Sequence, residues 1–177
     1  MKTKFNQNTL KRVIVAAIVV GSSILGSQSN ADRVTAMMNV SVYVSYSCSI
    51  NAAPMAFGAY DGVGANASIA LEATATIIST CTSGTGAHIT LNTGTFAGSG
   101  SADAPVRRMS AGEGKYLVYQ VYSDVTRDTV WGNTAQTGVA HIGTGAPQTL
   151  TVYGSIQAAQ MVPKGDYSDQ IYVTITY

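Results

Sequence analysis

The stretch VTAMMNVSVYVSYSC, residues 34–48, alternates apolar and mostly polar side chains along its whole length. Valine, alanine, methionine, tyrosine and cysteine occupy its even positions, and most of its odd positions are serine, threonine or asparagine. In an extended chain every second side chain points to the same face. The stretch therefore predicts a β-strand with one buried face.

Similar patterns recur along the chain, separated by segments rich in Gly, Asn, Asp and Pro, as turns require. Residues 115–122 are apolar on both faces, which predicts a central strand. No segment after residue 31 shows a helical stripe. Short strands and frequent turns predict an all-β protein, an antiparallel β-sandwich. The further strands are expected at 69–81, 88–91, 115–122, 129–131, 148–153 and 170–177.

Residues 1–31 have the three parts of a secretory signal peptide. Four basic and no acidic side chains precede the apolar stretch 13–25, and Ser29-Asn30-Ala31 supplies small residues for cleavage. Thirteen helical residues rise about 20 Å, less than the ~30 Å of hydrocarbon in a bilayer, which argues against a membrane anchor. We expect cleavage after Ala31, which leaves an exported chain of 146 residues without an integral membrane segment.

Charged residues make up only 11% of the chain, with ten Lys and Arg against nine Asp and Glu, and two His. Without a basic surplus, a nucleic-acid partner is not expected. So few acids and histidines, none at a metal-ligand spacing, also argue against an enzyme. We therefore expect no catalytic residues, no metal and no cofactor.

Cys48 and Cys81 are the only cysteines. In an exported protein, one disulfide between them is the expected arrangement, because the compartment is oxidising. Closing a loop of this length contributes roughly 4 kcal/mol in the chain-entropy model. A redox role is the alternative, but the two residues lack a CxxC spacing.

The two ends of the strand pattern do not match a closed sandwich. The 15 residues from Val34 to Cys48 span about 50 Å as a strand, whereas a globule of 146 residues is roughly 38 Å across. At the other end, alternation continues to the last residue, with no final strand after it. An extra leading strand and a missing last strand suit a subunit that adds its first segment to a neighbour's sheet. The alternative is that residues 34–38 fold back on their own domain or fray.

Two stretches and the cysteines form a series whose order and spacing are characteristic of a family. The central stretch is 119–124, followed by Arg127, Trp131 and Gly132. The C-terminal series is Tyr153-Gly154-Ser155-Ile156, Gln160, Pro163, Gly165, Tyr167, Asp169 and 173–177. Together with Cys48 and Cys81, they resemble the spore coat protein U domain family, which includes subunits of archaic chaperone–usher pili. The sequence departs from that family at 157–159, where many relatives have a proline.

This resemblance implies an incomplete immunoglobulin-like β-sandwich that lacks its last strand and exposes an apolar groove. In such pilins a periplasmic chaperone fills the groove, and an outer-membrane usher replaces it with the N-terminal donor strand of the next subunit. Carried onto this chain, residues 1–31 are the signal peptide, 32–39 the donor strand and 40–177 the pilin domain, whose first strand covers 40–48.

The resemblance also assigns individual residues. The donor strand inserts Val34, Ala36 and Met38, with Val40 near the junction. The groove is flanked by the strand at 40–48 and by the C-terminal strand. The side chains assigned to the C-terminal strand are Ile171, Val173, Ile175 and Tyr177, and the terminal carboxylate of Tyr177 is expected to bind basic residues of the chaperone.

The function implied by the resemblance is that of a structural pilin. Such a subunit passes through the periplasm and polymerises by donor-strand exchange into a surface pilus, a fimbrium, that supports adhesion and biofilm formation. Its partners are other copies of itself or related pilins, a periplasmic chaperone and an outer-membrane usher. The alternative is a surface-binding module, a tip adhesin or a spore or cell coat protein, that does not polymerise. Adhesins usually carry a separate receptor domain, for which 146 residues leave no room.

Overall fold

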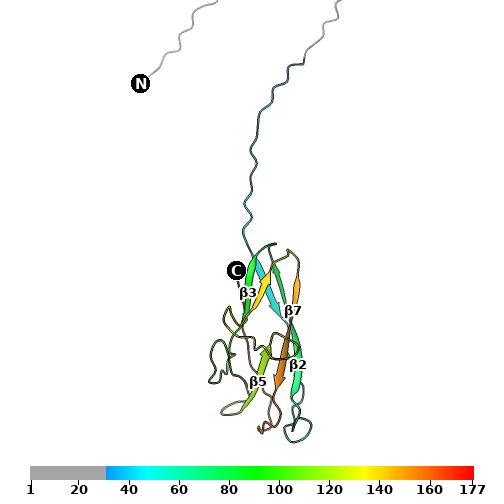
Figure 1. Ribbon diagram of the computed structural model, residues 1–177, viewed down its shortest axis with the longest axis vertical. Helices are drawn as coiled ribbons and strands as arrows, with labels where there is room; N and C mark the ends of the chain where they lie inside the picture. The colour runs from blue at the N-terminus through cyan, green and yellow to red at the C-terminus, as the bar shows by residue number, and fades with distance from the viewer. Residues whose placement is uncertain (1–30) are drawn as a thin grey trace, which may run out of the picture. The chain divides into compact units, whose positions relative to one another are not determined.

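The structure is a computed structural model that describes residues 31–177, so the predicted signal peptide lies outside it except for Ala31. The described residues form eight strands and no helix (Figure 1). Accordingly, none of the described residues belongs to a helix that could cross a membrane. The strands are β1 Cys48–Ala52, β2 Leu71–Cys81, β3 Gly86–Leu91, β4 Arg107–Ser110, β5 Tyr116–Tyr122, β6 Val139–Ile142, β7 Gln148–Ile156 and β8 Val173–Thr176.

The strands form two antiparallel sheets. The larger sheet has five strands in the order β1-β2-β7-β5-β4, and the smaller has three in the order β6-β3-β8. The longest ladder joins β2 to β7, from Leu71 opposite Ile156 to Ser79 opposite Gln148. This all-β arrangement of antiparallel sheets confirms the fold class predicted from the sequence. Four strands lie at sheet edges, namely β1, β4, β6 and β8.

The core lies between the two sheets and receives alternate side chains from both. Trp131 is its largest fully buried side chain, and its indole Nε1 donates a hydrogen bond of 2.8 Å to the carbonyl of Ile89 in β3. That bond satisfies the one polar atom of the indole, as a buried tryptophan requires. The other buried apolar side chains of this cluster are Ile77, Ile89, Leu91, Leu117, Tyr119, Val121, Val152 and Ile156.

The prediction of a first strand over 34–48 is wrong in its position. β1 begins at Cys48, and residues 31–47 are exposed and form no strand. The reason is that residues 34–47 have no neighbouring strand with which to pair. β2, which pairs with β1, ends at Cys81 opposite Cys48, and the chain then turns towards β3. The alternating pattern of residues 34–47 therefore suits a strand, but no strand of the described chain pairs with these residues.

Other predictions differ in smaller ways. Residues 129–131 form no strand, and only Val130 makes an isolated bridge, to Tyr122. β5 is an inner strand of its sheet, but only one of its faces is buried, because Tyr116 and Val118 are exposed. The remaining predicted strands correspond to β2, β3, β7 and β8, whereas the four-residue strands β4 and β6 were not predicted.

Candidate functional site

The core is open along one side, where a groove runs between the segment that follows β1 and the segment that leads into β8. One part, about 830 Å³ in volume, lies between residues 52–57, which follow β1, and residues 167–173, which lead into β8. A second part, about 980 Å³, lies between residues 55–63 and 160–167. The two parts are continuous, because Met55, Phe57, Met109 and Tyr167 line both. We call this combined cleft the groove.

The floor of the groove is the hydrophobic core itself. Ile77, Leu91 and Val121 are among the fully buried residues, and each also lines the groove. The walls carry apolar side chains that pack against the core but stay only partly covered, including Met55, Phe57, Ile171 and Val173. Within the described residues, no segment covers these side chains. The groove is therefore a gap in the sandwich and exposes apolar area that a complete core would bury.

Each wall of the groove reaches a strand edge, because Ala52, the last residue of β1, and Val173, the first residue of β8, line it. β8 pairs on one side with β3, from Val173 opposite Leu91 to Thr176 opposite His88, and β1 pairs only with β2. The Cα atoms of β1 and β8 come within 8 Å, yet no ladder of the described chain joins the two strands. Unpaired edges of this kind present free N–H and C=O groups that accept an added strand.

The wall that leads into β8 is held by Ser168 and Asp169. Ser168 exchanges backbone hydrogen bonds of 2.9 and 3.1 Å with Ser110 at the end of β4, in the larger sheet. Asp169 then accepts hydrogen bonds from the backbone N–H groups of Thr95 and Phe96, at 2.8 and 3.4 Å, and from the hydroxyl of Tyr119, at 2.6 Å. The chain thus passes from the larger sheet to β3 in the smaller one within a few residues.

The electrostatics of this wall favour a neutral phenol beside a carboxylate. Burial, followed by the hydrogen bond to Asp169, raises the pKa of the Tyr119 phenol far above its usual value. Tyr119 therefore remains a hydrogen-bond donor throughout the physiological pH range. Because Tyr119 and Asp169 both line the groove, their bond fixes the floor and the wall relative to each other.

Arg107 stabilises the far end of the same wall from inside the protein. It is fully buried, and its guanidinium donates to the carbonyls of Asn92, Leu91 and Trp131 and to Oε1 of Gln120, over 2.7 to 2.9 Å. Burial lowers the pKa of Arg107 to about 10, so the side chain stays protonated at neutral pH. The four bonds tie β4 to the end of β3. Arg107 could not be identified from the sequence, because nothing in the Arg-Arg pair at 107–108 shows which side chain turns inward.

The opposite wall depends on a glycine. A Cβ on Gly154 in β7 would lie only 2.8 Å from Cζ of Phe57 and would overlap the sulfur of Met55. Residues 53–57 can therefore pack closely on β7 only because position 154 has no side chain. The structure places this segment, rather than the predicted strand at 40–48, beside the groove.

The predicted donor residues belong to an exposed apolar row. Val34, Met38 and Val40 are 94%, 85% and 87% exposed, and Ala36 is exposed as well. The row continues on the same alternate positions beyond the predicted boundary at residue 39. Its later members are Val42, Val44 and Tyr46, all of them exposed. We call residues 34–47 the free segment.

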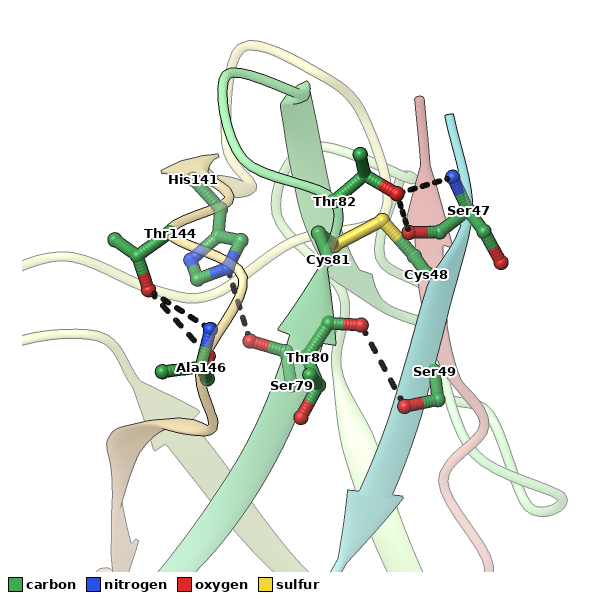
Figure 2. The surroundings of a disulfide bond; sticks show 10 residues. All are labelled: Ser47, Cys48, Ser49, Ser79, Thr80, Cys81, Thr82, His141, Thr144 and Ala146. Atoms are coloured by element: carbon green, nitrogen blue, oxygen red, sulfur yellow. Dashed lines mark hydrogen bonds between the residues drawn. A yellow bond between two sulfur atoms is a disulfide. The ribbon is translucent and has the colours of Figure 1, made fainter. Parts of the chain in front are cut away.

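The free segment ends at a covalent junction (Figure 2). Cys48 and Cys81 form the disulfide expected from the sequence, across the first residue pair of the β1–β2 ladder. Immediately before it, Thr82 holds Ser47 through both backbone groups. The N–H of Ser47 donates to Oγ1 of Thr82 at 3.1 Å, and its carbonyl accepts from the N–H of Thr82 at 2.9 Å. Nearby, Ser79 in β2 and His141 in β6 share a buried hydrogen bond of 3.0 Å that links the two sheets.

The remaining predicted site residues differ in their surroundings. Ile171 and Val173 line the groove, Ile175 packs partly buried against the core, and Tyr177 is 57% exposed. Within residues 31–177, no group of three or more His, Cys, Asp or Glu side chains is arranged to hold a metal ion.

Comparison with known proteins adds three findings. The model of the Spore Coat Protein U domain matches residues 34–174. Protein U of Myxococcus xanthus is 36% identical over 178 residues, which cover 96% of this chain and 99% of that protein. Among solved structures, the chain is similar to one in the CsuC-CsuE chaperone–tip adhesion subunit pre-assembly complex from archaic chaperone-usher Csu pili of Acinetobacter baumannii, with a TM-score of 0.54 and 20% identity. The match covers 76% of this chain but only 40% of that one, and at this identity it shows the fold alone.

Proposed function

This chain belongs to the spore coat protein U domain family, and we propose that it is a non-enzymatic subunit of a surface polymer, a pilin that assembles by donor-strand exchange. One observation supports this proposal above all others. The same chain carries a groove with a largely apolar part that reaches the unpaired edges of β1 and β8, and an apolar row that no described strand pairs with. In such a polymer, the free segment of one copy occupies the groove of the next and supplies the missing strand of its sandwich.

The exposed row argues for a donor strand that begins later and ends later than residues 32–39. All described residues up to Tyr46 are exposed and unpaired with any described strand, Ser47 is exposed but bonded to Thr82, and β1 begins only at Cys48. The donor strand thus lies within 34–47, and the domain it precedes begins at Cys48 rather than at residue 40. Each medium-sized apolar side chain buried in the groove contributes on the order of 1.5–3 kcal/mol, and ladder hydrogen bonds add roughly 1 kcal/mol each.

An open groove also explains the partners that we propose. Exposed apolar area beside unpaired edges promotes aggregation, so a subunit in transit needs a temporary occupant. A periplasmic chaperone fits that role, and an outer-membrane usher fits the exchange of chaperone for donor strand. We propose accordingly that residues 1–31 direct export and that the assembled protein is located on the cell surface.

A second candidate follows from the family description. The family model is named for a spore coat protein, and Protein U matches this chain over nearly its entire length. A coat or adhesive module without polymerisation would fill the groove in another way, with its own free segment or with a different protein. The two candidates differ in whether one copy is held by the next.

Two neighbouring residues of the free segment provide the test. Val42 and Tyr43 are 89% and 88% exposed, but they point to opposite faces of an extended strand. We expect Val42→Arg to abolish polymers, because it places an unpaired charge in an apolar groove, and Tyr43→Arg to leave them intact. The measurement is gel electrophoresis of material sheared from cells, in which unboiled wild-type polymer runs as an SDS-resistant ladder that collapses to about 15 kDa on boiling.

Two different results would contradict the donor assignment and the pilin proposal. A ladder that survives Val42→Arg contradicts the donor assignment. A wild-type protein that reaches the surface but gives no ladder under any condition favours the coat module over the pilin.

A further inference from the structure

Two methionines stand side by side in the free segment. Met37 is 94% exposed and Met38 is 85% exposed, so both thioethers are accessible to solvent in the unassembled chain. In an extended strand the two side chains point to opposite faces. Met38 belongs to the apolar row, whereas Met37 lies on the face that carries most of the polar residues. The two residues therefore share chemistry and exposure and differ in the face they occupy.

The part of the groove between residues 52–57 and 167–173 is lined mostly by apolar and aromatic side chains. Phe57, Val121, Ile171 and Val173 are among its lining residues. The hydroxyls of Tyr119 and Tyr167 line this part as well, but they already donate, to Asp169 and to the carbonyl of Pro163, and Gln170 is exposed to solvent. The carboxylate of Asp169 accepts hydrogen bonds and already receives them from Tyr119, Thr95 and Phe96. A thioether is suited to such surroundings, because methionine is apolar and fills irregular gaps. A sulfoxide is not, because its oxygen is a strong acceptor that needs a donor once it is removed from water.

From these observations we propose that Met38 is an oxidation-sensitive modification site that controls assembly, an inference that rests on the proposed function. A peroxide transfers one oxygen atom to the sulfur of Met38. The O–O bond breaks, the sulfur is oxidised by two electrons to the sulfoxide, and the peroxide is reduced to water or an alcohol. A free segment modified in this way binds the groove of the next copy weakly. The same reaction at Met37 leaves binding unchanged, because that side chain stays on the solvent side.

The modification acts only before assembly. Once Met38 is inserted, its sulfur is buried and no longer meets a peroxide in solution. Oxidation thus stops the addition of new subunits and leaves existing polymer intact.

The test uses three synthetic peptides with the sequence of residues 32–47, which contains no cysteine. One peptide is unmodified, one carries the sulfoxide at Met37, and one carries it at Met38. Each is titrated onto the full mature chain bearing Val42→Arg, so that the chain's own free segment does not compete. The readout is the urea midpoint of unfolding followed by the fluorescence of Trp131, the only tryptophan and a fully buried one. A ligand that binds only the folded state raises this midpoint.

We expect the unmodified and Met37-sulfoxide peptides to raise the midpoint equally. The Met38-sulfoxide peptide should require about tenfold more peptide, or more, for the same rise. Equal effects of all three peptides overturn the modification site and leave the groove as a donor-strand acceptor. Weakening by the Met37 sulfoxide alone overturns the assignment of faces. A chain that none of the peptides stabilises overturns the proposed function itself.

Discussion

At the scale of single residues, Arg107 and Arg108 show how position decides what a side chain does. Arg107 is enclosed by protein carbonyls, whereas its neighbour Arg108 lies partly exposed over the ring of Tyr116, with 4.2 Å between the guanidinium carbon and the ring centroid. Arg108 also donates to the carbonyls of Phe96 and Ala97. A buried cation without hydrogen-bond partners lowers the stability of the fold, and buried carbonyls that lose the cation lower it as well.

We predict that Arg107→Leu destabilises the peptide-complemented chain by about 3 kcal/mol, because the three carbonyls of Leu91, Asn92 and Trp131 lose their donors inside the protein. The matched variant Arg108→Leu should cost about 1 kcal/mol or less, because water replaces its bonds. Urea unfolding followed by the fluorescence of Trp131 measures both. Equal losses from the two variants would show that the buried network does not stabilise the groove wall.

At the scale of strands, the sequence predicted which segments are extended better than it predicted which strands pair with one another. Alternation identified β2, β3, β7 and β8 because each has a buried face, and a buried face is what a period of two records. Val34 to Ser47 shows the limit of that signal. The same period is present there, but pairing depends on where β2 ends, which the local sequence does not encode.

The groove could be predicted on one side only. The family resemblance implied a wall at the C-terminal strand, and Ile171 and Val173 do line the groove. The other wall contains Met55 and Phe57 in a segment without a strand pattern, and their packing depends on Gly154, far away in the sequence. Contacts of that kind follow from the three-dimensional fold, and the family resemblance implied a wall at 40–48 instead.

Edge strands supply a prediction at this scale. When the free-segment peptide binds, we expect backbone amides of β8 to exchange hydrogen more slowly, because the open edge of β8 gains a partner. β6 is the matched control, since it is the other edge of the same three-stranded sheet and does not line the groove. Hydrogen-exchange mass spectrometry measures both strands. Protection that rises equally in β6 and β8 would indicate general stabilisation rather than strand addition at the groove.

At the scale of the whole molecule, the proposed function links stability to assembly. If another copy fills the open groove, the sandwich gains its remaining burial from that copy, and its stability then depends on the concentration of that partner and on how much of the groove is occupied. Residues 1–31 predicted export, the low charge argued against an enzyme, and export in turn predicted a disulfide between the two cysteines. These features could not show that the disulfide lies at the point where the free segment joins the body, because that depends on the register of β1 with β2.

In the fibre proposed above, that junction determines which strand receives the force when the fibre is pulled. Force carried by the free segment arrives at Ser47 and would unzip the short β1 from β2 one bond at a time, beginning at Cys48 opposite Cys81. The covalent crosslink blocks the first step and passes the force directly into β2, which is anchored along β7. Fibres of the double variant Cys48→Ser, Cys81→Ser should consequently lengthen at lower force in optical tweezers than fibres of the unaltered protein, and identical force–extension curves would show that the bond carries no tension.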